Sequence, residues 1–186
     1  MPVHDLELLL DVAGAAGDIA LKYFKNDPET WEKDGDQGPV TVADMEVNAM
    51  LEARLKAARP DYGWLSEETD DDLARLDCDR VFILDPIDGT RSFIMGHENF
   101  AHSFAVAEKG VVTEAVVHLP AKKMTFAATR GGGATLNGEP IAPSDANDLA
   151  EAEVLAAKPM MKAEHWAGGV PPVKRNFRSS LAYRLA

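Results

Sequence analysis

The sequence contains a single cysteine, Cys78, among its 186 residues. One cysteine excludes an internal disulfide framework and is typical of proteins that fold in a reducing compartment. The sequence also lacks a basic and apolar leader at its first residues, and no apolar run approaches the length of a membrane-spanning helix. These absences predict a soluble, cytoplasmic protein without a membrane partner.

Basic residues are few, because 19 Lys and Arg stand against 31 Asp and Glu, which gives a formal net charge of −12. This excess of acid argues against a nucleic-acid polymer as a partner, since phosphate backbones select basic surfaces. An acidic protein can still bind small phosphorylated molecules when bound cations reverse the field locally. Hydrophobic residues make up 46% of the chain, so global disorder is excluded and a packed core is expected.

Hydrophobic periodicity predicts two helices in the first third of the chain. The first is an amphipathic helix from Asp5 to Phe24, and the second runs to Ala58 with Thr41 as its N-cap. Between them, the polar and glycine-containing stretch from Asn26 to Gly38 predicts a mobile loop.

Short apolar runs bounded by turn residues predict a set of strands after the second helix. The last three of these runs are joined by short turns and predict an antiparallel meander. The segment 149–157 is ambiguous between helix and strand, and 163–176 is typical of a surface loop. The predicted strands cover residues 62–66, 80–84, 103–107, 111–117 and 124–129.

The most informative stretch is Asp85-Pro86-Ile87-Asp88-Gly89-Thr90, which directly follows an apolar run. A buried strand that ends here would deliver two hard oxygen ligands, Asp85 and Asp88, to one point. The turn at Gly89 and Thr90 would then expose backbone N–H groups at a helix start, where phosphate binds. A divalent cation and a phosphate placed side by side are what a metal-assisted phosphatase needs.

A third carboxylate, Glu67, follows the predicted strand at 62–66. If this strand neighbours the one before Asp85, then Glu67, Asp85 and Asp88 converge at the carboxyl ends of both. Crowded carboxylates repel one another, so either one stays protonated or a cation lies among them. All-oxygen ligation without His or Cys favours Mg²⁺ or Mn²⁺ over zinc.

These carboxylates, and two further charged residues near the start of the chain, Asp44 and Lys33, also have plain structural interpretations. Asp85 and Asp88 could cap a helix, Asp44 could face a helix dipole, and Lys33 could be a solvated loop charge. The combination of Glu67 with the whole six-residue string weighs against simple capping. The histidines show no ligand spacing, which favours surface or core positions for His4, His97, His102, His118 and His165.

Four motifs stand out in the chain: Thr41-Val42-Ala43-Asp44, Ser66-Glu67-Glu68, Asp85 to Thr90 with Phe93, and Leu136-Asn137-Gly138. Together, they resemble the inositol monophosphatase superfamily of Mg²⁺-dependent, lithium-sensitive phosphomonoesterases. The resemblance implies an α/β fold, the layered αβαβα sandwich of that superfamily. Residues 1–145 would form an N-terminal metal-binding α+β domain with the meander, and 146–186 would start a C-terminal α/β subdomain. A homodimer is also implied.

The resemblance further implies a role for each matching residue. Metal ligands would be the side chains of Glu67, Asp85 and Asp88 and the backbone carbonyl of Ile87. The amides of Gly89 and Thr90 would hold the substrate phosphate.

The catalytic residues implied by the resemblance are Asp44, Thr90 and Glu67, with the Thr90 hydroxyl and Asp44 orienting and activating the attacking water. Lys33 matches a lysine of an active-site loop. The implied cofactor is Mg²⁺, with Mn²⁺ as a substitute and Li⁺ as an inhibitor.

One feature of the superfamily does not occur here. Relatives carry a downstream Trp-Asp motif whose Asp completes the second metal site, and this sequence reaches Ala186 without it. Residues 178–186 begin a helix, with Ser179 or Ser180 as N-cap, that is expected to have little to pack on. We therefore hypothesise a truncated form whose C-terminal part is missing.

Three branches of the superfamily, which differ in substrate, fit the sequence, and a fourth possibility is a protein without catalytic activity. Leu65 before Ser66-Glu67-Glu68 is similar to the 3'(2'),5'-bisphosphate nucleotidases, and residues 90–94 are similar to histidinol-phosphatases. Inositol monophosphatase is the broad default, with a small phosphorylated metabolite as substrate in every case. The alternative is a catalytically incomplete fragment that binds metal or phosphate without turnover.

Overall fold

The computed structural model describes residues 4–33, 35, 38–71, 73–145, 147–150 and 152–186. Its centre is a seven-stranded sheet of order β3-β4-β5-β6-β7-β8-β9, in which β3 and β4 are parallel and the other neighbours are antiparallel. The strands are β1 Thr30–Glu32, β2 Pro39–Thr41, β3 Gly63–Ser66, β4 Arg80–Asp88, β5 Ala101–Glu108, β6 Val111–Leu119, β7 Met124–Thr129, β8 Gly133–Leu136, β9 Glu139–Ile141, β10 Glu153–Leu155 and β11 Lys174–Asn176. The helices are α1 Asp5–Tyr23, α2 Val42–Ala58, α3 Thr90–Ile94 and α4 Leu181–Leu185, with short 3₁₀ turns at Ala74–Asp77, Pro120–Lys122, Lys158–Met161 and Ala163–His165.

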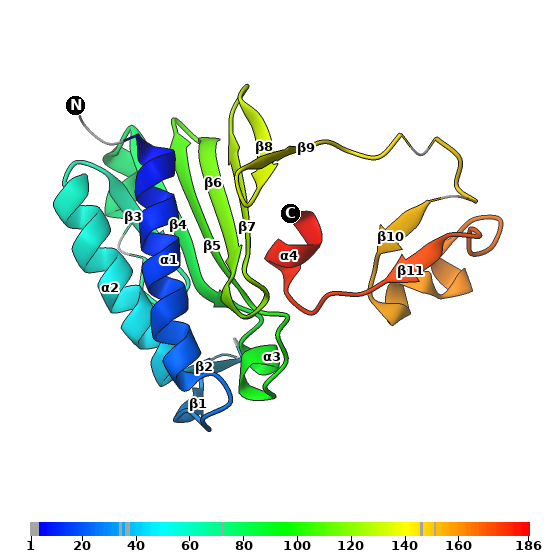
Figure 1. Ribbon diagram of the computed structural model, residues 1–186, viewed down its shortest axis with the longest axis horizontal. Coiled ribbons are helices and arrows are strands. Elements are labelled where there is room, and N and C mark those ends of the chain that lie inside the picture. Colours follow the sequence, from blue (N-terminus) through cyan, green and yellow to red (C-terminus); the bar gives the residue numbers. More distant parts are fainter. Residues whose placement is uncertain (1–3, 34, 36–37, 72, 146, 151) are drawn as a thin grey trace.

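Helices α1 and α2 lie side by side over one face of the sheet (Figure 1). Both were predicted, and α2 begins where the sequence places it because Thr41 forms a reciprocal cap with Asp44. The Thr41 hydroxyl accepts hydrogen bonds from the N–H groups of Ala43 and Asp44, at 3.1 and 3.4 Å, while Thr41 N–H donates to Asp44 Oδ2 at 2.9 Å. This capping box satisfies the first turn of α2 and fixes the Asp44 carboxylate at its start.

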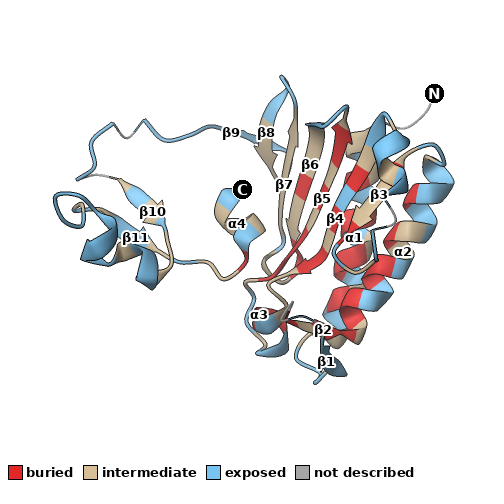
Figure 2. Ribbon diagram, turned by 180° about the vertical axis from the view of Figure 1, so that it is seen from behind, coloured by how far each residue is buried: buried red, intermediate tan, exposed pale blue. Residues whose placement is uncertain are grey.

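The main core lies between these two helices and the middle of the sheet. Figure 2 shows the buried residues gathered on the inner faces of α1 and α2 and on the central strands. Leu9, Leu51, Phe82 and Phe104 are among the largest fully buried side chains. Burial of each contributes about 1.5–3 kcal/mol, so this layer is the rigid support of the sheet.

A second apolar cluster lies at the end of the sheet where β4 ends. It contains Ile87, Phe93 and Phe100, together with Ala20 of α1 and Ala43 of α2. The Phe93 and Phe100 rings meet edge to face, with their centroids 4.9 Å apart. This cluster supports the Asp85–Thr90 segment from the side of the helices.

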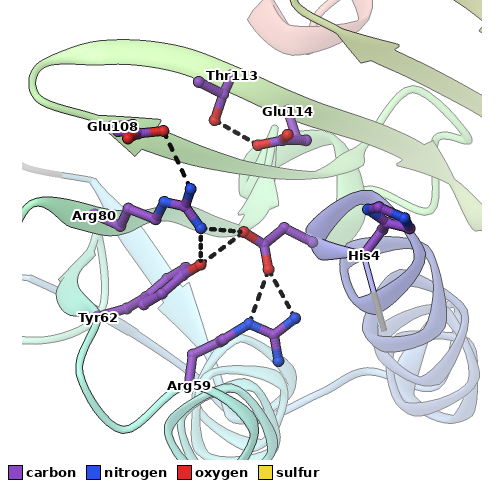
Figure 3. Close-up of a pocket in the computed structure, with 8 residues that line it drawn as sticks. His4, Arg59, Tyr62, Arg80, Glu108, Thr113 and Glu114 are labelled. Atoms are coloured by element: carbon purple, nitrogen blue, oxygen red, sulfur yellow. Dashed lines mark hydrogen bonds and ion pairs between the residues drawn. The ribbon is translucent and has the colours of Figure 1, made fainter. Parts of the chain in front are cut away.

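The opposite end of β4 is held by a network of charged groups around Asp5 (Figure 3). The Asp5 carboxylate accepts hydrogen bonds from Arg59 Nε at 2.9 Å and from the Tyr62 hydroxyl at 2.8 Å. Arg80 donates to the Tyr62 hydroxyl at 2.7 Å and to Glu108 at 3.3 Å, beside a cavity of about 340 Å³. The network ties the start of α1 to the end of α2 and to the sheet.

The C-terminal segment leaves the sheet after β9, forms the β10–β11 pair and then returns (Figure 1). It places α4 on the sheet face opposite α1 and α2, with Ser180 fully buried and the Tyr183 ring 6.4 Å from that of Phe126. None of the residues of α4 is buried, and Leu181 and Leu185 are 53% and 81% exposed, so the helix has little to pack on, as expected. The boundary between residues 145 and 146 stays a prediction.

Several predicted elements need correction. The loop from Asn26 to Gly38 is wrong in part, because β1 pairs with β2 as a short antiparallel hairpin, while residues 34, 36 and 37 lie outside the described residues. The surface loop at 163–176 ends in β11, and the ambiguous segment 149–157 contains β10. Two strands, β8 and β9, were missed because they are short and rich in turn residues. In the described part of the chain, no helix is long and apolar enough to cross a membrane.

Candidate active site at the end of β3 and β4

The parallel pairing of β3 and β4 brings the predicted carboxylates to one edge. Ser66 is the register partner of Leu84, and Glu67 N–H donates to the Leu84 carbonyl at 3.1 Å. Parallel strands end at the same edge of a sheet, so Glu67 lies beside Asp85. The convergence predicted for these two residues is present in the structure.

A β-bulge then shapes the segment that carries Asp85 and Asp88. Asp85 pairs with Ser103 and Asp88 with Ala101, so two residues of β4 lie opposite the single residue His102 of β5. In a regular strand, residues three apart point to opposite faces, and the extra residue of a bulge brings them to the same side. The prediction that the strand ends at Leu84 is wrong, because β4 continues to Asp88 and carries the carboxylates within it.

The Asp85 carboxyl is the most perturbed acid of the site. Its Oδ1 atom is buried and has no hydrogen-bond partner among the described residues. Burial, reinforced by the charges of Glu67 and Asp88 and by a hydrogen bond with Glu67, raises the pKa of Asp85 to about 9. A buried oxygen without a donor is what a bound cation would satisfy.

The residues at this edge fit a hard divalent cation by the chemistry of their donors. Carboxylate oxygens and the Ile87 carbonyl are the ligands that Mg²⁺ prefers, and the unpaired Oδ1 of Asp85 is available for one. No group of three or more His, Cys, Asp and Glu side chains is already arranged to hold a metal in the part of the chain that the structure describes. The fit therefore depends on the donor types and on the unpaired oxygen.

Asp88 has partners that the sequence did not reveal. Its Oδ2 atom accepts a hydrogen bond from the Ser180 hydroxyl and another, at 2.8 Å, from Ala182 N–H. Asp88 thus fixes the first turn of α4 at the edge of the site. Ser180 was one of two predicted N-caps, but its position 92 residues after Asp88 gave no sign of this contact.

Asp44 and Thr90 lie together beside these carboxylates. Thr90 Oγ1 is 3.4 Å from Asp44 Oδ1 and 3.0 Å from the Ile87 carbonyl oxygen, so its proton can be donated to either. Burial raises the pKa of Asp44, although the hydrogen bonds from Thr41 oppose this. The pair is a hydroxyl next to a buried base, which is the arrangement needed to orient and deprotonate a water.

Gly89 makes the turn from β4 into α3. Its φ of +91° lies in the left-handed region, and a Cβ atom there would be 3.1 Å from the Asn99 carbonyl oxygen. The Gly89 and Thr90 amides therefore stand at the start of a short helix, next to the carboxylates. Their predicted role in phosphate binding stays a prediction.

Lys33 reaches this site from the β1–β2 hairpin. Its Nζ is 2.7 Å from Glu68 Oε1 and 3.1 Å from Glu67 Oε1. The side chain of Lys33 is only 13% exposed and that of Glu68 only 5%, so the interpretation of Lys33 as a solvated charge is wrong. Burial would lower the pKa of Lys33, but the hydrogen bonds to Glu68 and Glu67 outweigh it and raise the pKa.

Comparison with family models matches residues 4–178 to the inositol monophosphatase family. The chain belongs to this family. Among the relatives, it is 36% identical over 138 residues to histidinol-phosphatase of Chlorobaculum parvum, covering 74% of this chain and 52% of the relative. It is 34% identical over 164 residues to Nus factor SuhB of Escherichia coli K12, covering 87% of this chain and 60% of the relative.

A solved structure of an IMPase from Thermotoga maritima has the same fold. It superposes with a TM-score of 0.82 at 27% identity, covering 97% of this chain and 70% of that one. The layered α/β fold predicted from the sequence is thereby confirmed. Relatives in this family are named as phosphatases, which are hydrolases. The chain spans about half to three-fifths of the length of the curated relatives given above.

The Lys33 contacts of this family member give a first testable prediction. Lys33→Met leaves the buried Glu68 carboxylate without its cation, so the metal-free protein should lose about 1–3 kcal/mol of unfolding free energy. Urea denaturation in EDTA measures this loss. Lys162→Met, which removes an exposed partner of Glu164, is the matched control and should leave the stability unchanged. Equal effects of both substitutions would contradict the prediction.

Proposed function

We propose that this protein hydrolyses a small-molecule phosphate monoester with the help of Mg²⁺. The observation that carries the proposal is the Asp44–Thr90 pair, with 3.4 Å between Oδ1 and Oγ1, standing beside the unpaired Asp85 Oδ1. A phosphatase site needs a base, a hydroxyl that orients water, and a carboxylate oxygen free to bind the metal, all next to a helix start.

The residues that would hold Mg²⁺ are Glu67, Asp85 and Asp88 through their side chains and Ile87 through its carbonyl. Bound Mg²⁺ would activate water as a nucleophile and neutralise the charge on the phosphoryl and leaving oxygens. Mn²⁺ would substitute for Mg²⁺, and Li⁺ would inhibit. The ligating carboxyls must be ionised for this, so Asp85 has to lose its proton when the cation binds.

The chain's own groups would orient the water and move its proton. The Thr90 hydroxyl can accept a hydrogen bond from the water while it donates to Asp44, and the buried carboxylate of Asp44 would take the proton. The amides of Gly89 and Thr90 would hold the substrate phosphate in line with that water. Lys33, through Glu67 and Glu68, would keep the outer carboxylates in place.

The test is phosphate release with Mg²⁺ and with EDTA from four substrates: inositol 1-phosphate, histidinol phosphate, adenosine 3',5'-bisphosphate and fructose 1,6-bisphosphate. We expect release from at least one of them in Mg²⁺ and none in EDTA. Asp88→Asn should reduce the rate by about 10²-fold or more, while Asp61→Asn, at an exposed carboxylate of the loop before β3, should not change it. An Asp88→Asn variant as active as the parent would refute the metal role.

Histidinol phosphate is the substrate with a specific observation in its favour. The stretch Thr90-Arg91-Ser92-Phe93-Ile94 is similar to that of histidinol-phosphatases, and a relative of that name is 36% identical to this chain. Inositol monophosphates remain the alternative, supported by the IMPase of similar fold. The bisphosphate nucleotidase alternative is supported only by Leu65 before the Glu pair. A ranking of kcat/KM among the four substrates decides between them.

The remaining expectations about the whole protein are part of this proposal. It would be a cytoplasmic homodimer that acts on a small phosphorylated metabolite and has no nucleic-acid polymer or membrane as partner. The alternative of another class is a fragment that binds metal or phosphate without turnover, since the chain spans 52–60% of two curated relatives. Stabilisation by Mg²⁺ without release from any of the four substrates would favour that alternative.

A further inference from the structure

We propose that His102 is a positioning residue that holds the β4 bulge and thereby sets the relative placement of Asp85 and Asp88. The inference rests on the proposed metal site, but it concerns a residue that the motifs do not include. His102 Nδ1 is hydrogen-bonded to the carbonyl oxygen of Pro86, one residue after Asp85 and two before Asp88.

The bulge explains why a side chain is needed at this point. Pro86 and Ile87 lie together opposite His102, so the regular ladder of backbone hydrogen bonds between β4 and β5 is interrupted there. Pro86 has no N–H, and its carbonyl is buried with the rest of the residue. A buried carbonyl that is not paired in the ladder costs free energy unless another donor reaches it. The imidazole of His102 is that donor.

The contact also fixes the state of the imidazole ring. A carbonyl oxygen only accepts hydrogen bonds, so Nδ1 carries the proton and Nε2 is left as an acceptor. Nε2 is buried and has no partner among the residues that the structure describes. Burial lowers the pKa of His102 to about 4, so the ring stays neutral in this position. An ordinary apolar side chain would avoid the cost of the unpaired Nε2, which indicates that the contact with Pro86 is the reason for a histidine here.

The ring cannot easily turn away from Pro86. His102 is fully buried, and its ring stacks on the rings of Phe104 and His118, with a centroid separation of 6.0 Å in each pair. Phe100 meets the ring edge-on at 6.4 Å. A packed ring with one orientation is the kind of support that holds metal-binding side chains in place through a backbone group.

The neighbouring His118 provides a matched control. It is the cross-strand partner of His102 on β6 and shares the same stack of rings. Its Nδ1 is 2.9 Å from the Thr125 hydroxyl, so its contact is with β7 and not with the bulge. His118 is less buried than His102, so the comparison depends on Mg²⁺ affinity and on exchange at the bulge, and not on overall stability.

The experiment compares His102→Leu, His102→Asn and His118→Leu in two measurements. The first is the Mg²⁺ dissociation constant from calorimetry, which does not depend on turnover. We expect about a tenfold weaker affinity for His102→Leu and an unchanged affinity for His118→Leu. His102→Asn should recover most of the affinity, because its amide N–H can donate to the same carbonyl.

The second measurement is hydrogen exchange at the amides of Ile87, Asp88 and Gly89 in EDTA. We expect faster exchange in His102→Leu than in His118→Leu, and protection in His102→Asn close to that of the parent. Equal exchange and equal affinity in the two Leu variants would overturn the proposal. If His102→Leu does not fold, His102→Asn decides. A Mg²⁺ affinity and exchange rates that match those of the parent support the proposal. A weaker affinity together with faster exchange at Ile87, Asp88 and Gly89 overturns it. A parent that binds Mg²⁺ but releases no phosphate would defeat the proposed function and leave this test intact.

Discussion

Asp85→Asn should abolish Mg²⁺-dependent phosphate release and at the same time make the metal-free protein more stable at alkaline pH. The first effect, on the order of 10³-fold, follows from the loss of a charged ligand at the centre of the site. The second follows from the buried Oδ1 of Asp85, which has no hydrogen-bond donor among the described residues when the carboxyl ionises at high pH. A residue placed for function and not for stability is expected to show both effects.

The sign of the pH dependence follows from the raised pKa of Asp85, about 9 in the folded metal-free protein. In the unfolded chain the same carboxyl ionises near its ordinary pKa of about 4. Folding therefore takes up a proton at pH values between these two pKa values. The stability that the protonated Asp85 contributes is fully present below about pH 4 and is lost as the pH rises through about 9. Asn cannot ionise, so the stability gain of Asp85→Asn should grow with pH.

Urea denaturation in EDTA at pH 5.5 and 8.5 measures this gain. We expect Asp85→Asn to exceed the parent by about 1–3 kcal/mol at pH 8.5, with a smaller difference at pH 5.5. In excess Mg²⁺ the order should reverse, because the parent is stabilised by the cation and the variant is not. Asp61→Asn, at an exposed carboxylate, serves as control and should show neither effect. A variant that is destabilised at pH 8.5 in EDTA would contradict the assigned environment of Asp85.

Much of this site could be predicted from local sequence. Thr41 before the apolar pattern of α2 is enough to place the start of that helix, where the structure shows a capping box with Asp44. Asp85 and Asp88 follow an apolar run, which is enough to predict two hard ligands close together, although β4 continues through both of them. The predicted strand at 62–66 likewise places Glu67 at a strand end, and the parallel pairing of β3 and β4 brings it to the same edge. The family resemblance adds the roles predicted for Asp44 and Thr90.

The parts that could not be predicted depend on partners far along the chain. Lys33 is 34 residues from Glu67, and Ser180 is 92 residues from Asp88, so neither contact leaves a local pattern. The bulge in β4 also depends on residues far along the chain. It is visible only in the register of β4 against β5, where Asp85 pairs with Ser103 while Asp88 pairs with Ala101. The contact of His102 depends on this bulge, so the sequence predicts no more than a surface or core position for it.

Asp44→Asn should slow the chemical step by about 10²–10⁴-fold while it leaves Mg²⁺ affinity near that of the parent. Asn keeps an oxygen that can accept from Thr41 N–H, so the cap of α2 is retained, but it cannot take a proton from water. Thr90→Val, which removes the hydroxyl 3.4 Å from Asp44, should have a comparable effect. Single-turnover rates and calorimetric Mg²⁺ binding separate the chemical step from metal affinity.

The double variant tests whether these two residues act on the same proton. If Thr90 orients the water that Asp44 deprotonates, then the combined loss of Asp44→Asn and Thr90→Val should be far smaller than the product of the single losses. The parent should also show an acid limb in its rate profile, displaced upward because burial raises the pKa of Asp44. At saturating Mg²⁺, where the cation keeps the ligating carboxyls ionised, that limb should disappear from the residual activity of Asp44→Asn. Multiplicative losses, together with an unchanged acid limb in Asp44→Asn, would show that the base is another group.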